Sequence, residues 1–147
     1  MDTSNKQIEQ QMTVLLRRVQ RIHMSTSSGQ VDIDRSAYGI MCKLADDGPQ
    51  RLGAFAAAFG LDPSTITRQV QALEKAGLAE RSADAADRRA SILALTDEGL
   101  EVLNRTRDYR RQRLDAVLAD WSDTDRENLG RLLEKLNSSI EALVERS

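Results

Sequence analysis

The chain has little of what several protein classes require. Its 147 residues include one cysteine, Cys42, and one histidine, His23, so an intrachain disulfide and a multi-cysteine metal site are excluded. Aromatic residues, which favour strands, make up only 3%. Only two prolines interrupt the chain, so helix is the favoured secondary structure. The longest nearly apolar run, 54–61, is too short to cross a bilayer, and the N-terminus lacks the apolar segment of a signal peptide. We expect a soluble, mainly helical, cytoplasmic protein without a membrane partner.

The excess of one sign of charge over the other is also small. Twenty-one Lys and Arg against 23 Asp and Glu give a net charge of −2, which by itself argues against a polyanionic partner. The acidity is uneven, however: residues 51–89 carry six basic and five acidic side chains, whereas residues 90–147 carry nine and twelve. The local field of the middle segment therefore decides whether it can meet a phosphate. No Ser/His/Asp or Cys/His pairing, phosphate loop or metal-ligand spacing is present, so we expect neither an enzyme nor a cofactor.

Hydrophobic periodicity orders the chain as four helices, a hairpin and two more helices. Helices are predicted at about 6–25, 36–45, from Pro49 in a first turn to Phe59, and at 63–76. Strands are predicted at 78–81 and 91–95, followed by a long helix that Thr96 caps and whose apolar positions include Leu118 and Trp121. Ser122 caps a last helix that runs to the end of the chain. The fold class is mainly α with a small β-hairpin, in a single domain covering 1–147.

Two of these helices, 52–59 and 64–76, are joined by the tight turn 60–63 and fit a helix-turn-helix. At 100° per residue, the second helix turns a polar face away from its buried stripe of Ile66, Val70 and Leu73. A helix of this kind enters the major groove, where short polar side chains and an arginine can reach base edges and phosphates. The candidate DNA-binding residues of this helix are Ser64, Thr65, Thr67, Arg68, Gln71 and Lys75.

The hairpin would then be a wing whose tip carries Arg88 and Arg89, aimed at a minor groove or at the DNA backbone. The Asp87 carboxylate can hold the guanidinium of Arg88 or Arg89 in one orientation. Asp84, together with Asp87, is expected to dilute the positive charge of the wing. From the residues alone, a Ser/Thr-rich first turn can equally be helix capping, and an Arg-rich loop can simply be solvated.

Three segments together resemble the MarR-type winged helix-turn-helix transcriptional regulators. They are Leu-Asp-Pro-Ser-Thr-Ile-Thr-Arg at 61–68, Leu-Glu-Lys-Ala-Gly-Leu-Ala-Glu-Arg at 73–81, and Asp-Arg-Arg-Ala at 87–90 followed by Leu-Ala-Leu-Thr-Asp-Glu-Gly at 93–99. The resemblance implies a homodimer paired through helices in about 1–30 and 100–147, with the winged helix-turn-helix in about 34–99. It also implies binding to a pseudo-palindromic operator in double-stranded DNA, and repression relieved by a small apolar or phenolic effector or by an oxidant. The family's recognition-helix and wing positions fall on Ser64, Thr65, Thr67, Arg68, Gln71, Asp87 and Arg89.

Several single residues could have a functional role, but a structural role explains each of them more simply. Cys42 lies among apolar residues, which favours a buried, inert thiol over a redox switch. His23 ends the first helix, where a cation suits the helix dipole. The arginines of 105–113 alternate with acidic residues, which favours a solvated helix face over a DNA contact. Met24, Tyr38 and Met41 can line an effector pocket or form ordinary core, so no effector residue is identified.

Two functions remain open at this stage. The first is a dimeric, sequence-specific DNA-binding repressor without catalytic activity. The alternative is a helical protein-interaction regulator that keeps the fold but does not bind DNA specifically. Salt-dependent DNA binding separates the two, because only the first releases counterions from the phosphates.

Overall fold

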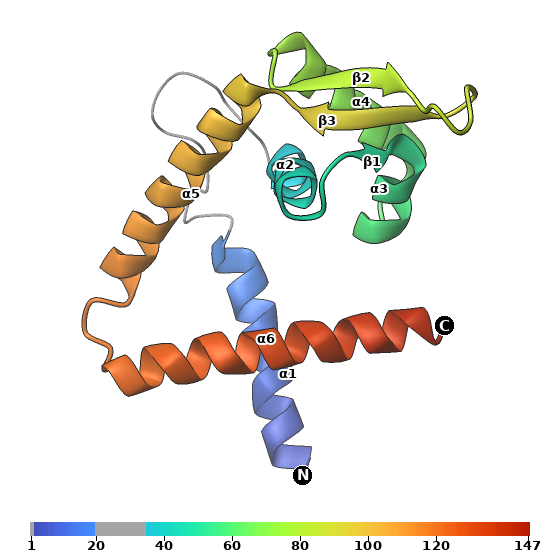
Figure 1. The fold of residues 1–147 in the computed structure, drawn as a ribbon. Coiled ribbons are helices and arrows are strands. Elements are labelled where there is room, and N and C mark those ends of the chain that lie inside the picture. Colours follow the sequence, from blue (N-terminus) through green and yellow to red (C-terminus); the bar gives the residue numbers. More distant parts are fainter. Residues whose placement is uncertain (1, 20–34) are drawn as a thin grey trace. The chain divides into compact units, whose positions relative to one another are not determined.

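The computed structural model describes residues 2–19 and 35–147 (Figure 1). The predicted end of the first helix, His23 and Met24 lie outside the described residues. The chain forms two compact units, 1–110 and 111–147. The elements, in chain order, are α1 Asp2–Val19, α2 Arg35–Asp47, β1 Gln50–Arg51, α3 Leu52–Phe59, α4 Pro63–Lys75, β2 Ala79–Ala83, β3 Ser91–Leu95, α5 Asp97–Val117 and α6 Asp123–Glu145.

The core of the first unit lies where α2, α3, α4, β3 and the start of α5 meet. Phe55, Ile40 and Leu103 have no exposed surface, and they come from three different helices. The Phe55 ring stacks in parallel on Phe59, with 6.2 Å between the ring centroids. Burying large apolar side chains completely contributes about 1.5–3 kcal/mol each. This shared core fixes the winged helix-turn-helix as one packed unit. Its remaining buried apolar residues are Ala37, Met41, Leu44, Ile66, Val70, Leu73, Leu78, Ala79, Leu93 and Val102.

The prediction that Pro49 begins the third helix is wrong. Gln50 and Arg51 form a short strand instead, pairing antiparallel with Leu93 and Ile92 of β3, and the helix begins only at Leu52. Pairing with β3 gives the backbone of these two residues hydrogen-bond partners that lie some forty residues away in the chain. The predicted hairpin is therefore part of a three-stranded antiparallel sheet in the order β1-β3-β2 (Figure 1).

The turn into α4 is as predicted. Gly60 has φ 61°, the left-handed conformation that glycine adopts without strain, and it ends α3. Asp62 is the N-cap of α4, and Pro63 occupies its first turn. The wing follows α4: Ala79 pairs with Leu95, and the register continues to Ala83 opposite Ser91.

The start of α5 docks on the turn that follows α4. Thr96 donates its hydroxyl hydrogen to the Gly77 carbonyl at 2.7 Å and accepts the Gly99 N–H at 3.0 Å. Gly99 lies so close to Leu78 that a Cβ built on it would be 1.9 Å from the Leu78 carbonyl oxygen. The segment Leu-Thr-Asp-Glu-Gly at 95–99, which carries part of the resemblance to MarR-type regulators, therefore has a packing role, because it joins the wing to the long helix.

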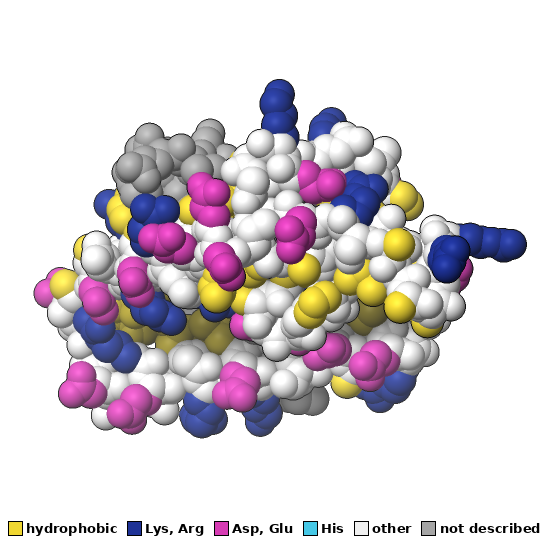
Figure 2. All heavy atoms as spheres, turned by 45° about the horizontal axis from the view of Figure 1, so that its top comes forward, with side chains coloured by type: hydrophobic (Ala, Val, Ile, Leu, Met, Phe, Trp, Pro, Cys, Tyr) yellow, Lys and Arg dark blue, Asp and Glu magenta, His cyan; other side chains and the backbone are white. Residues whose placement is uncertain are grey.

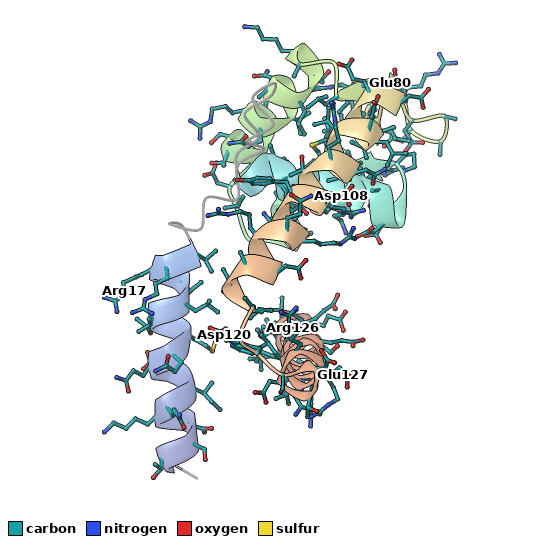
Figure 3. The ribbon with its side chains drawn as sticks, turned by 90° about the vertical axis from the view of Figure 1, so that its left-hand side faces the viewer. Arg17, Glu80, Asp108, Asp120, Arg126 and Glu127 are labelled. Atoms are coloured by element: carbon teal, nitrogen blue, oxygen red, sulfur yellow. The ribbon has the colours of Figure 1, made fainter. Side chains whose placement is uncertain are left out.

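The second unit is built around α6. Helix α5 ends at Val117, so Leu118 and Trp121, predicted as positions of that helix, lie in the connection. Ser122 caps α6 as predicted, accepting the Asp125 N–H at 3.1 Å. Arg126, labelled in Figure 3, donates to the Leu118 carbonyl at 2.6 Å and thereby fastens the connection to the start of α6. The apolar stripe of α6 is exposed at Leu132, Leu133, Leu136, Ile140, Leu143 and Val144.

Candidate nucleic-acid interface

Helix α4 has one buried and one exposed face. Ile66, Val70 and Leu73 are buried in the core, whereas Arg68, Gln71 and Lys75 lie on the exposed side. Within the described residues, the side chains of these three make no hydrogen bond or ion pair. Their donors are therefore directed into solvent and remain available to a ligand.

The hydroxyls in the first two turns of α4 are already engaged. Ser64 and Thr65 both donate to the Asp62 carboxylate, Thr65 at 2.9 Å, and Thr67 donates to the Pro63 carbonyl at 2.9 Å. Capping and solvent exposure thus coexist at these positions, since Ser64 and Thr67 are exposed and Thr65 is partly so. A hydroxyl that has given its single hydrogen still offers lone pairs.

Asp62 is held as a carboxylate by this arrangement. The Ser64 hydroxyl, the Thr65 N–H and the Thr65 hydroxyl lower the pKa of Asp62 to about 2. Hydrogen bonds to the ionised form cause the shift, and the positive end of the α4 dipole favours the same charge.

The tip of the wing is basic and exposed. Arg88 and Arg89 are exposed, and Figure 2 shows Lys and Arg side chains projecting at the right-hand edge, on the side where Figure 1 draws the β2–β3 loop. Asp87 accepts the main-chain N–H of Arg89 at 3.0 Å. The carboxylate therefore shapes the loop, and within the described residues it does not clamp a guanidinium as predicted.

Asp84 is not the solvent-exposed carboxylate of the wing that its polar surroundings in the sequence suggested. Asp84 is only 8% exposed and forms an ion pair with Arg51 at 2.5 Å. The Ala86 N–H, which donates to its carboxylate, lowers the pKa of Asp84; burial opposes this effect and the Arg51 guanidinium adds to it. Arg51 itself was missed by the sequence analysis, because its place beside the wing depends on β1, which no local pattern indicates.

Two arginines of α5 differ from the prediction of a solvated face, whereas Arg105, Arg111 and Arg113 are exposed as predicted. Arg107 donates to Asp46 of α2 at 3.2 Å, and the Arg110 guanidinium lies 4.2 Å from the centre of the Tyr38 ring. Both side chains are partly buried and link α5 to α2, so they do not belong to a solvated face.

Cys42 is part of the same contact between α2 and α5. It is partly buried, where a buried thiol was predicted. Burial raises the pKa of Tyr38, and a hydrogen bond with Cys42 adds to this effect. Met41 is fully buried and so belongs to the core.

No helix of the described residues is long and apolar enough to cross a membrane. Nor do three or more His, Cys, Asp or Glu side chains gather anywhere in 2–19 or 35–147 as ligands for a metal ion would.

Comparison with known proteins agrees with this arrangement. The MarR family model matches residues 33–91. Over 134 residues the chain is 32% identical to the HTH-type transcriptional regulator YxaD of Bacillus subtilis, covering 90% of this chain and 92% of that protein. The chain belongs to the MarR family. It is therefore a DNA-binding transcriptional regulator with a winged helix-turn-helix.

Two further comparisons extend over most of the chain. The HTH-type transcriptional repressor NicR of Pseudomonas putida is 26% identical over 144 residues, covering 96% of this chain and 91% of NicR. The PcaV transcriptional regulator of Streptomyces coelicolor, solved in complex with its natural ligand, has a TM-score of 0.65 and 26% identity. That match covers 86% of this chain and 91% of the PcaV chain.

Proposed function

We propose that this regulator represses transcription by binding a pseudo-palindromic operator as a homodimer. Helix α4 enters the major groove, and the wing contacts the adjacent minor groove or backbone. The observation that carries the proposal is the exposed polar face of α4, whose Arg68, Gln71 and Lys75 have no partner in the described chain.

The hydrogen bonds of α4 give its residues different roles. Arg68 suits the O6 and N7 acceptors of a guanine, and Gln71 suits adenine. Ser64, Thr65 and Thr67 have given their hydroxyl hydrogens to Asp62 and Pro63. In this arrangement they can only accept, and phosphates only accept as well, so these hydroxyls suit the amino groups of adenine or cytosine.

The remaining site residues act on the DNA backbone. Lys75 lies at the end of α4, where a cation meets a phosphate without reading sequence. Arg88 and Arg89 extend the contact from the wing, and Asp87 shapes the loop that presents them.

Repression and its relief have separate support. NicR, named a repressor, resembles this chain over nearly its whole length, which supports repression. The ligand complex of PcaV supports a small effector, which we propose to be apolar or phenolic. The exposed apolar stripes of α1 and α6 support a homodimer, since such stripes are normally covered by a partner.

The experiment is a footprint and titration of the full chain on the DNA upstream of its own coding sequence. Arg68→Ala is expected to cost about 1–3 kcal/mol of operator binding and to relax specificity at one base pair of each half-site. Arg89→Ala is expected to weaken all sequences more evenly. Arg131→Ala, which removes the same charge from an exposed position of α6, is the control and is expected to change neither. An Arg68→Ala protein with unchanged affinity and specificity would contradict the assignment of α4.

A further inference from the structure

The ion pair between Arg51 and Asp84 crosses the sheet. Arg51 is on β1, at one edge, and lies opposite Ile92 of the central strand β3. Asp84 follows β2, the other edge strand, and its N–H donates to the Ala90 carbonyl at 3.1 Å where the wing loop closes. The pair thus connects the two edge strands across β3, at the end of the hairpin where the wing loop begins.

The two partners are buried to different extents. The side chain of Asp84 is 10% exposed, whereas that of Arg51 is 53% exposed. Asp84 also accepts the Ala86 N–H at 2.9 Å, so its carboxylate is held by the loop on one side and by the guanidinium on the other. The Nη2 of Arg51 is therefore held by Asp84, and about half of the Arg51 side chain remains exposed to solvent.

A surface hollow of about 490 Å³ adjoins this pair. It is lined by Arg51 and the first residues of α3 on one side and by Arg89, Ala90 and Ser91 of the wing on the other. Two arginines that are 38 positions apart in the chain thus flank one hollow. Within the described residues Asp84 is the carboxylate that pairs with Arg51, and no carboxylate pairs with Arg89.

We propose that Arg51 and Arg89 bind a phosphate of the DNA backbone together at this hollow, and that Asp84 is the positioning residue that holds Arg51 and the wing in register for it. The inference rests on the proposed function, because the phosphate belongs to the DNA that α4 reads. Two arginines that line one hollow suit a phosphate, whose oxygens accept from several donors at once. Because Asp84 is buried against Arg51, it does not itself face the DNA.

The substitution Asp84→Asn distinguishes this role from a simple charge effect. Asparagine keeps an oxygen that can accept the Ala86 N–H and removes one negative charge per subunit. If Asp84 only weakened the positive field of the wing, the variant would bind DNA more tightly. If Asp84 positions Arg51, the variant binds more weakly.

The test uses the full chain and the footprinted operator, with affinity measured from low to moderate KCl. Arg51→Gln removes one phosphate contact in each of two subunits. The slope of log K against log[KCl], which is negative, is therefore expected to become shallower by about two. Asp84→Asn is expected to weaken binding by about fivefold and to change the slope in the same direction. The double variant is expected to match Arg51→Gln alone, because Asp84 acts through Arg51. Asp84→Glu, which keeps the charge, is expected to recover part of the loss.

Arg81→Gln is the matched control. Arg81 also lies on the sheet and pairs with a carboxylate, Glu74, at 2.6 Å, but it does not line the hollow. Its slope is expected to equal that of the wild type.

Tighter binding by Asp84→Asn, or an unchanged slope for Arg51→Gln, would overturn the inference. If Asp84→Asn fails to fold in a thermal melt, Arg51→Gln decides alone. The proposed function fails separately, through Arg68→Ala.

Discussion

At the scale of single residues, Asp62 combines two roles at the entrance to α4. It caps the helix and orients the Ser64 and Thr65 hydroxyls. Under the proposed function, its side chain sets which hydrogen-bonding atoms the first turn of α4 presents to DNA. The sequence indicated the cap, because Asp-Pro before an apolar stripe is a helix start. It could not indicate that the hydroxyls donate back to the cap.

Asp62 also makes stability depend on pH. The native pKa of Asp62 is about 2, below the usual value of 3.8, so its ionised form stabilises the fold. This stabilisation is complete above about pH 5 and is lost as the pH falls from about 4 towards 2. Asp62→Asn keeps an oxygen acceptor but cannot ionise. In urea unfolding, the wild type is expected to be more stable than Asp62→Asn at pH 7, with the difference shrinking below pH 4. A difference that stays constant from pH 7 to pH 2 would contradict this account.

The residues that sequence reasoning misjudged are those whose partners are far along the chain. Arg107 pairs with Asp46, 61 positions away, and Asp84 pairs with Arg51. An arginine among acidic neighbours, or an aspartate in a polar loop, is locally indistinguishable from a solvated side chain. Only the packing of α5 on α2, and of β1 on β3, brings these partners together.

At the scale of elements, the junction between the wing and α5 depends on a close approach of two backbones. Replacing Gly99 by alanine places a methyl group against the Leu78 carbonyl, which cannot move aside as a flexible side chain would. Gly99→Ala is expected to destabilise the protein by about 1–3 kcal/mol. Gly130→Ala in α6, where an added Cβ meets nothing within 4 Å, is the control and is expected to stabilise by about 0.5–1 kcal/mol. Denaturant unfolding measures both, and an equal effect of the two substitutions would refute the role given to Gly99.

Most of the elements could be predicted, because their ends carry local chemistry. Gly60, Asp62, Thr96 and Ser122 end or begin helices where the sequence indicated. The two-residue strand β1 could not be predicted. It has no periodicity of its own, and only its long-range pairing with β3 makes it a strand.

At the scale of the whole molecule, α6 carries a long stripe of exposed apolar side chains. Leu133 and Leu136 are 43% and 37% exposed, and we propose that a second copy covers them. Leu133→Glu would bury an unpaired charge in the dimer, so the dimer dissociation constant is expected to rise at least about tenfold. Ser138→Glu adds the same charge on the opposite side of the helix and is expected to leave the dimer intact. Sedimentation equilibrium measures both, and a Leu133→Glu protein that stays dimeric would exclude this stripe from the interface.

The net charge of −2 also has to be considered at this scale. It does not prevent DNA binding, because the local field at α4 and the wing is what a phosphate meets. We expect weak non-specific affinity, with much of the binding energy coming from the second subunit and from oriented contacts. The sequence could predict the exposed polar face of α4 and the basic tip of the wing, since both carry local motifs. Those motifs do not specify the base sequence of the operator.

Selection of DNA from a random pool by the full chain tests the central claim most directly. The account predicts enrichment of an inverted repeat whose half-site centres lie about one helical turn, roughly 10 bp, apart. The Arg68→Ala protein is expected to lose the preference at one position of each half-site. A wild-type protein that retains DNA without enriching any sequence, or that enriches a single unrepeated site, would contradict the account.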